Sequence, residues 1–436
     1  MHPLRRDAVP SRYRPQSSDS VKYSIITFGC RVNQADSLAI ARDLHLRGAV
    51  EASPQNADLV VVNTCSVTAA ADQGVRQTVR RVARDNPGVR VVVTGCYATR
   101  RPDEVRELPN ILHIVSNDEK DDLVERLASQ IGLPRLEDVT TAVRYGSGDG
   151  PCGEALSPGT AGRTALTLRV QTGCDETCSY CIIPTTRGKG RSRPLNAVVR
   201  QIADAVASGY REMAIAGVHL GSYGRDLNDG TSLTTLVRVL SEWDADVLFR
   251  ISSLEPMDCT AEIVDLISSS PRLAPHFHLP LQHGSDEILR AMRRPYTASA
   301  YVTLVSSIRA RIPHASIGSD LIVGFPGESS AHFTETESVL CDVPLTHLHV
   351  FPYSDRPGTD ASLLGARVDG AVVRERGRRV RDIGHEMAAR FRESQRGTTR
   401  RALTVDDGSS AVTDNYLKVK LHRRHSRNEW VDVRVD

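Results

Sequence analysis

The sequence of 436 residues lacks any apolar run near the roughly 20 residues that a membrane span needs. Its first residues, MHPLRRDAVPSRYRPQSSDS, lack the apolar core of a signal peptide. The net charge is only +2, and the proportions of hydrophobic (40%) and charged (25%) residues exclude a disordered or fibrous chain. We therefore expect a cytoplasmic globular protein of two or three domains, with no membrane partner.

Although the net charge is small, positive charge gathers near the C-terminus. From Arg374 to the end, 16 Lys and Arg stand against 10 Asp and Glu. A basic tail on an acidic body favours a polyanionic partner. A solvated, arginine-rich surface explains the same composition, so both interpretations stay open.

Cysteine is sparse, and its pattern excludes a disulfide framework. The count is odd and the spacing is wide, which favours metal or redox use of some thiols. The nine cysteines are Cys30, Cys65, Cys96, Cys152, Cys174, Cys178, Cys181, Cys259 and Cys341. We interpret Cys152 as incidental, and Cys259 and Cys341 as packing residues.

Three β-branched runs near the N-terminus each end in a cysteine: YSIITFGC (23–30), DLVVVNTC (58–65) and VVVTGC (91–96). Helical segments at 33–48 and 68–86 separate them, so the strands should be parallel within one sheet. The carboxyl ends of such strands share one edge, where ligands usually bind. Cys30, Cys65 and Cys96 should therefore converge on one site. Three buried core thiols are the alternative.

These patterns predict an α/β protein with three domains. A parallel α/β sheet domain occupies 22–133, and a Gly/Ser/Pro-rich linker covers 134–163. Six alternating strand and helix units in 164–396 suggest a partial (β/α)6 barrel with its chemistry at the carboxyl ends of the strands. Short alternating runs in 397–436 predict a small antiparallel β module, joined to the barrel by an arginine-rich helix. The predicted barrel strands are 166–170, 213–216, 248–251, 277–280, 317–323 and 347–351.

The strongest chemical motif is the loop GCDETCSYC (173–181), which directly follows the strand LTLRV. Its spacing is C-x3-C-x2-C. The thiolates of Cys174, Cys178 and Cys181 can bind three irons of a cubane cluster and leave the fourth iron open for chemistry. A zinc knuckle is the alternative, but it needs a fourth Cys or His close by, and none follows.

This loop resembles the signature of the radical S-adenosylmethionine superfamily, in which the open iron chelates the cofactor and an electron from the cluster releases a 5′-deoxyadenosyl radical. The motifs FGCRVNQADS, VNTCSVT and TGCY resemble the N-terminal domain of the methylthiotransferases within that superfamily. The resemblance implies two [4Fe-4S] clusters. Cys174, Cys178 and Cys181 would be catalytic ligands of one, and the auxiliary cluster would be held by Cys30, Cys65 and Cys96.

The resemblance extends through the barrel to the end of the chain, with motifs such as SSLEP (252–256) and FPYSDRPGT (351–359). It implies that Gly217, Glu255 and Gln282 bind S-adenosylmethionine, although a turn glycine and polar strand ends also arise for structural reasons. The family commonly has Ser where this chain has His283. We expect His283 to play a mild role rather than contact substrate.

Two further features suggest RNA. Four basic residues follow the cysteine loop, where phosphate contacts or a solvated loop would explain them: Arg187, Lys189, Arg191 and Arg193. The segment DNYLKVKL (414–421) resembles the end of a TRAM module, a small β-barrel that binds RNA in relatives. The module is shorter here than usual.

Within the family, Cys30-Arg31-Val32-Asn33-Gln34 and FPYSDRPGT most resemble the enzymes that act on N6-threonylcarbamoyladenosine in tRNA. The resemblance implies methylthiolation of adenine carbon 2 at position 37 with two S-adenosylmethionine molecules. One methylates a sulfur at the auxiliary cluster, and the other yields the radical. It also implies an electron donor such as flavodoxin or ferredoxin and a sulfur source, with no DNA. Methylthiolation of isopentenyladenosine or of a ribosomal protein aspartate is the alternative, and an RNA-binding protein with structural clusters is a third.

Overall fold

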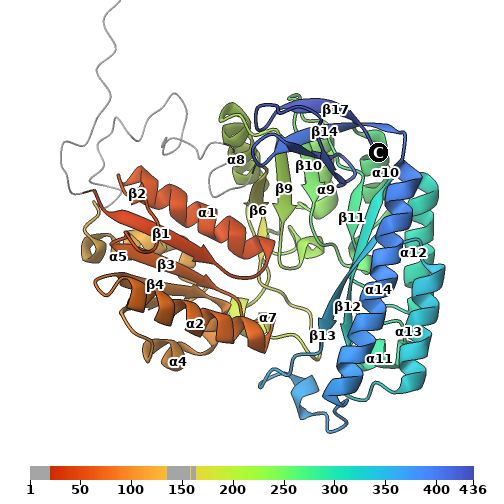
Figure 1. Cartoon of the computed structure of the whole chain (residues 1–436), viewed down its shortest axis with the longest axis horizontal. Helices are drawn as coiled ribbons and strands as arrows, with labels where there is room; N and C mark the ends of the chain where they lie inside the picture. The colour runs from red at the N-terminus through yellow and green to blue at the C-terminus, as the bar shows by residue number, and fades with distance from the viewer. Residues whose placement is uncertain (1–19, 135–157, 159–163) are drawn as a thin grey trace, which may run out of the picture.

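A computed structural model of the chain describes residues 20–134, 158 and 164–436, and these form an α/β architecture (Figure 1). Most of the predicted linker, including Cys152, lies outside the described residues. In the described part of the chain, no helix is long and apolar enough to cross a membrane.

The N-terminal layer (residues 20–134) is a parallel five-stranded sheet in the order β2-β1-β3-β4-β5. Helices pack on both of its faces, so β3 and β4 are valine-rich and almost wholly buried. The strands are β1 (Lys22–Thr27), β2 (Val50–Glu51), β3 (Leu59–Thr64), β4 (Arg90–Gly95) and β5 (Ile111–Val115). The helices are α1 (Arg31–Leu46), α2 (Ala69–Asp85), α3 (Cys96–Arg100), α4 (Pro102–Arg106) and α5 (Leu123–Ile131), with a 3-10 turn at Lys120–Asp122.

The six predicted strands of the partial barrel are present, but they hydrogen-bond as two ladders, β10-β9-β6 and β11-β12-β13. Isolated parallel bridges such as Ser253 to His278 join the ladders. The strands are β6 (Leu166–Arg169), β9 (Glu212–Ala216), β10 (Leu248–Ile251), β11 (His276–His278), β12 (Ser316–Val323) and β13 (His347–Pro352). The α/β prediction with a parallel N-terminal sheet and a βα barrel is confirmed.

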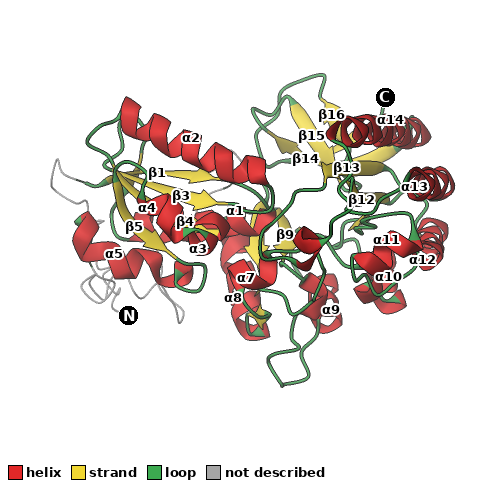
Figure 2. Ribbon diagram, turned by 90° about the horizontal axis from the view of Figure 1, so that it is seen from below, coloured by secondary structure: helices red, strands yellow, loops and turns green. Residues whose placement is uncertain are grey.

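Helices cover the outer side of the barrel and bury one large apolar core between themselves and the strands (Figure 2). They are α7 (Ile183–Arg187), α8 (Leu195–Ala207), α9 (Leu233–Ser241), α10 (Ala261–Ser269), α11 (Asp286–Ala291), α12 (Ala298–Arg311), α13 (Ser330–Asp342) and α14 (Gly370–Gln395). Short 3-10 turns lie at Leu220–Ser222, Pro256–Asp258 and Asp360–Leu363. Cys259 is buried in this core as predicted, whereas Cys341 is exposed on α13, so its interpretation as a packing residue was wrong.

The C-terminal module is an antiparallel sheet in the order β16-β15-β14-β17. Its strands are β14 (Thr399–Val405), β15 (Ser410–Thr413), β16 (Lys418–Lys420) and β17 (Trp430–Arg434), of which β15 was not predicted. The module docks on the barrel, because Arg250 of β10 donates to the carbonyl of Asp414 at 3.0 Å and Asn415 donates to the carbonyl of His314 at 3.0 Å.

Candidate functional site

Cys30, Cys65 and Cys96 lie together at the carboxyl edge of the N-terminal sheet. Each follows one of three neighbouring strands, β1, β3 and β4. Gly29 brings the first loop directly over the second thiol, since a Cβ atom there would lie 2.7 Å from Cys65 Sγ. The predicted convergence of the three thiols is therefore present in the structure.

Two buried asparagines hold this edge in shape. Asn33 of α1 donates to the carbonyls of Phe28 at 2.7 Å and Thr64 at 2.8 Å, which precede the first two cysteines. Asn63 of β3 donates back to the carbonyl of Asn33 at 2.8 Å. The asparagine in the motif Arg-Val-Asn-Gln thus fixes the loops that carry the thiols.

The second group, Cys174, Cys178 and Cys181, lies on the loop between β7 (Gln171–Thr172) and α7. A two-stranded antiparallel ladder with β8 (Arg191–Ser192) closes the base of this loop. Gly173 has a φ of +73°, and a side chain there would overlap the carbonyl of Lys189. The loop is also held by α11, because the hydroxyl of Ser179 donates to the carbonyl of Ala291 at 2.7 Å.

Positive groups surround the sulfurs of this loop. Arg294 donates to Cys178 Sγ at 3.1 Å and forms an ion pair with Glu255. His219 bonds Asp258 at 2.8 Å and Cys174. Burial would lower the pKa of His219, but these two hydrogen bonds outweigh burial and raise its pKa to about 10. Sequence reasoning did not indicate Arg294, and it placed His219 only within the loop 216–219 that the family resemblance brings near the cofactor.

The buried thiols are suited to bind a metal rather than to react as free nucleophiles. Burial raises the pKa of Cys65 to about 11 and that of Cys181 to about 12, so both stay protonated without a metal at neutral pH. A cluster bound by three thiolates carries negative charge, and hydrogen bonds to its sulfurs stabilise that charge. Arg294 and His219 can supply those bonds at one site, and Asn117, which donates to Cys96 Sγ at 3.6 Å, at the other. Both donor sets therefore fit iron–sulfur clusters.

The predicted cofactor-binding residues lie at neighbouring strand ends. Gly217 follows β9, and an added Cβ would approach Gln171 within 3.2 Å. Glu255 follows β10 and reaches Cys178 through Arg294. Gln282 follows β11 with a φ of +68°. Of these three residues, Glu255 is thus connected to the cysteine loop through Arg294.

His283, which follows Gln282 in the chain, is enclosed by the protein. It is buried, its Nδ1 accepts from the Ser285 amide at 3.0 Å, and its Nε2 lies 3.7 Å from Glu328. That His283 has a mild role and does not contact substrate stays a prediction.

The short helix α7 connects the two cysteine groups. It begins directly after the loop of Cys181 and ends at Arg187, which hydrogen-bonds Cys96 and Asn33. Asn117 also donates to the carbonyl of Thr186 at 2.7 Å. The loop of one group and the sheet edge of the other are therefore fixed against each other.

A buried ion cluster fixes the N-terminal layer to the barrel. Asp36 of α1 accepts from Lys120 at 3.0 Å, from Arg169 at 2.7 Å and from Arg187 at 3.2 Å. Arg187 is buried, so the suggestion that it contacts phosphate is wrong. Arg191 pairs with Asp118 at 2.9 Å, while Lys189 is exposed.

The motif FPYSDRPGT also acts at this contact. Its Arg356 donates to the carbonyl of Val67, just after Cys65, at 3.2 Å, and pairs with Asp72 at 2.9 Å.

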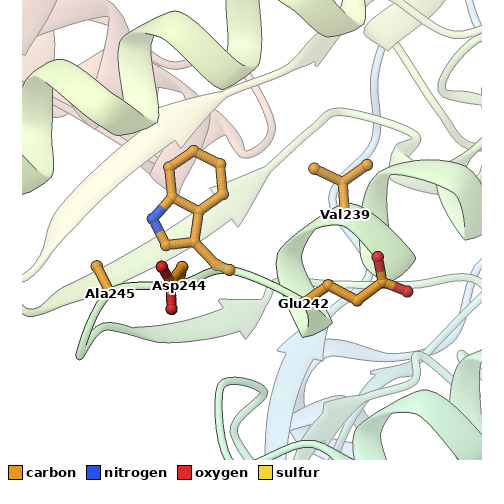
Figure 3. A pocket seen from close by; sticks show the side chains of 5 residues that line it. Val239, Glu242, Asp244 and Ala245 are labelled. Atoms are coloured by element: carbon orange, nitrogen blue, oxygen red, sulfur yellow. The ribbon is translucent and has the colours of Figure 1, made fainter.

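A surface pocket lies at the end of α9, outside these motifs (Figure 3). Neither a thiol nor an imidazole lines it, so it lacks the metal-binding groups of the cysteine sites. Its lining residues are Val239, Glu242, Trp243, Asp244 and Ala245.

Comparison with known proteins agrees with this geometry. Residues 22–116 match the family model "Uncharacterized protein family UPF0004", and residues 168–340 match "Radical SAM superfamily". The chain is 35% identical to the threonylcarbamoyladenosine tRNA methylthiotransferase MtaB of Aquifex aeolicus, over 92% of this chain and 96% of that protein. It is 33% identical to the ribosomal protein uS12 methylthiotransferase RimO of Salinispora tropica, over 90% and 86%.

A solved structure shares the fold. The radical S-adenosylmethionine methyltransferase TsrM of Kitasatospora setae aligns with a TM-score of 0.55 and 14% identity, over 79% of this chain and 75% of that one. The cofactors of the family are [4Fe-4S] clusters and S-adenosylmethionine. The two groups of three thiols fit the clusters. The chain belongs to the radical S-adenosylmethionine methylthiotransferase family of enzymes.

Proposed function

We propose that this enzyme methylthiolates carbon 2 of N6-threonylcarbamoyladenosine at position 37 of tRNA. The observation that carries the proposal is the pair of three-thiol sites on the two sides of α7, since attachment of a methylthio group needs both a radical source and a sulfur site. The identity to a relative named for the threonylcarbamoyladenosine substrate, over nearly its whole length, supports the choice of substrate.

We assign the cluster that binds S-adenosylmethionine to Cys174, Cys178 and Cys181, and the auxiliary cluster to Cys30, Cys65 and Cys96. When bound, these groups supply the radical, the methyl group and the sulfur site. The protein's own contribution is positioning. Arg294 and His219 balance thiolate charge, while Glu255, Gly217 and Gln282 lie where the cofactor would be held.

Each domain has a separate role in this proposal. We assign residues 22–133 to the auxiliary cluster, 164–396 to the radical chemistry, and 397–436 to tRNA contact, with 134–163 as the linker. Exposed basic side chains of the C-terminal module support the last assignment, among them Lys420 and Arg423. An external electron donor such as flavodoxin or ferredoxin and a sulfur source complete the reaction.

Mass spectrometry of nucleosides from digested tRNA tests the proposal. Cells without the gene should accumulate N6-threonylcarbamoyladenosine without its methylthio group, and the restored gene should return the modified form. Loss of methylthio-isopentenyladenosine instead would contradict the substrate. Intact tRNA together with an unmodified ribosomal protein uS12 would favour the alternative reaction.

A further inference from the structure

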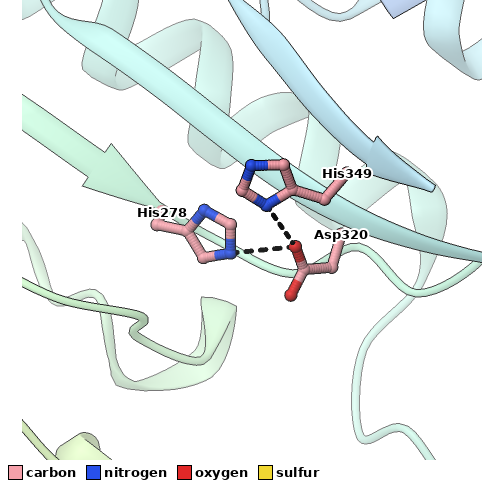
Figure 4. Close-up of side chains that lie close together, drawn as sticks. All are labelled: His278, Asp320 and His349. Carbon is pink, nitrogen blue, oxygen red and sulfur yellow. Dashed lines mark hydrogen bonds and ion pairs between the residues drawn. The ribbon is translucent and has the colours of Figure 1, made fainter. Parts of the chain in front are cut away.

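Three polar side chains that are not part of either thiol group, His278, Asp320 and His349, lie together on the strands β11, β12 and β13. His278 Nε2 and His349 Nδ1 each lie 3.1 Å from the same oxygen, Oδ1 of Asp320 (Figure 4). The strand register pairs Asp320 with His349 and Gly318 with His347, so these positions share one face. Asp320 thus orients two imidazoles toward the same side.

Three histidines on these strands, His276, His347 and His349, differ in burial and in the direction of their pKa shift. Burial lowers the pKa of His347 to about 4 and that of His276 well below its usual range. The hydrogen bond to Asp320 raises the pKa of His349, whose side chain is 57% exposed. His349 is therefore the exposed histidine of the group, and its hydrogen bond to Asp320 favours the protonated imidazole.

Arg31 of the N-terminal layer faces the same group. Its guanidinium donates to the Tyr416 hydroxyl at 2.8 Å, and its charge acts on His349 and His276. Among the described residues, Arg31 contacts the hydroxyl and the ring of Tyr416, and no ion pair joins it to a carboxylate. Its positive charge is thus not balanced by a near acid.

Arg250 is a second arginine that contacts Tyr416, and one of its N–H groups has no acceptor within the described residues. Arg250 is buried and pairs with Glu212 at 3.1 Å, and its guanidinium lies 4.6 Å from the ring centre of Tyr416. In the described part of the chain, its Nη2 atom has no hydrogen-bond acceptor. Both arginines contact one tyrosine, so this region of the described chain offers an unpaired N–H donor of Arg250 and the positive charge of Arg31, as an anion site requires.

We propose that Arg31 and His349 form the subsite that binds the carboxylate of the threonylcarbamoyl group, with Asp320 holding His349 in position. The proposal rests on the function proposed above. The substituent on adenosine N6 carries a carboxylate, a hydroxyl and amide groups. An isopentenyl substituent has none of them and would leave the Arg31 guanidinium and the His349 imidazole without an anionic partner.

A divalent cation is the competing occupant, because the ligand atoms of His278, Asp320 and His349 lie within 4.8 Å of one another. Asp320 already accepts two hydrogen bonds, and the charge of Arg31 opposes a second cation nearby. The balance of charge favours an anion.

The test uses reconstituted enzyme and two anticodon stem-loop RNAs, one with N6-threonylcarbamoyladenosine and one with its carboxylate converted to a methylamide. The wild type should show a KM roughly 10- to 100-fold lower for the carboxylate, the range for a charge-assisted pair. Arg31→Gln and His349→Gln should each shrink this preference, and Arg31→Lys should retain part of it. The matched control is Arg80→Gln, an exposed arginine of α2.

Two results would overturn the proposal. The first is an undiminished preference for the carboxylate in both Arg31→Gln and His349→Gln. The second is stoichiometric zinc in the wild type that is lost in Asp320→Asn, which would assign the group to a cation. If the proposed function itself is wrong, the wild type will turn over neither RNA, which distinguishes that outcome from a wrong subsite.

Discussion

Asp36 is the residue whose loss should most weaken the contact between the two cluster sites. The Asp36→Ala variant leaves the buried cations of Lys120 and Arg187 without their shared acid. Breaking a buried ion pair from one side costs about 3–5 kcal/mol, because the remaining charge stays desolvated. We therefore expect the free energy of unfolding to fall by about that amount.

Urea denaturation under anaerobic conditions, followed by far-UV circular dichroism, measures this change. The control is Asp118→Ala, which removes the exposed partner of Arg191 at the same interface and should cost no more than about 1 kcal/mol. If both variants lost the same small amount, the buried cluster would not hold the layers together.

The difference in stability between the wild type and Asp36→Ala should depend on pH. Burial would raise the pKa of Asp36, but the charges of Lys120, Arg187 and Arg169 outweigh burial and lower it from 3.8 to about 2. A depressed pKa contributes stability above the unfolded value that is lost as pH falls through the folded value. The stability difference between the wild type and Asp36→Ala should therefore shrink between pH 4 and pH 2.

Three further predictions concern the clusters, the RNA surface and a turn. Reconstituted enzyme should hold about eight irons. About half should be lost in each triple alanine variant, with S-adenosylmethionine cleavage abolished only in the barrel-loop variant; bound zinc or full iron retention would contradict this. Lys420→Glu with Arg423→Glu should weaken tRNA binding and reduce the slope of log Kd against log salt, by about one per lost phosphate contact, in filter-binding titrations. Gly95→Ala should reduce iron at the auxiliary site by elemental analysis, because the residue has a φ of +98° and its new Cβ would overlap the Thr64 carbonyl.

Much of the fold could be predicted from the sequence, because it follows from local patterns. The β-branched runs that each end in a cysteine predicted the parallel sheet and the convergence of Cys30, Cys65 and Cys96. The spacing of the second cysteine loop favoured a [4Fe-4S] cluster, and the open iron at that loop stays a prediction. These features depend on neighbouring residues and on the geometry common to parallel sheets.

The rest depends on contacts between distant segments. Arg294 meets Cys178, and Arg187 is buried against Asp36 rather than exposed toward phosphate. The group around Asp320 forms only when three strands align in register. Neither composition nor spacing indicates such pairings, and the strand β15 is too short for its alternation to stand out.

The most direct test of the account is a turnover assay with purified, reconstituted enzyme. The substrates are an anticodon stem-loop with N6-threonylcarbamoyladenosine, S-adenosylmethionine and a reductant, and liquid chromatography with mass spectrometry reads the nucleosides. We predict a product in which a methylthio group has replaced the hydrogen at adenine carbon 2, and none when Cys30, Cys65 and Cys96 are alanine. An unchanged nucleoside with the wild type, under conditions where S-adenosylmethionine is cleaved, would contradict the account.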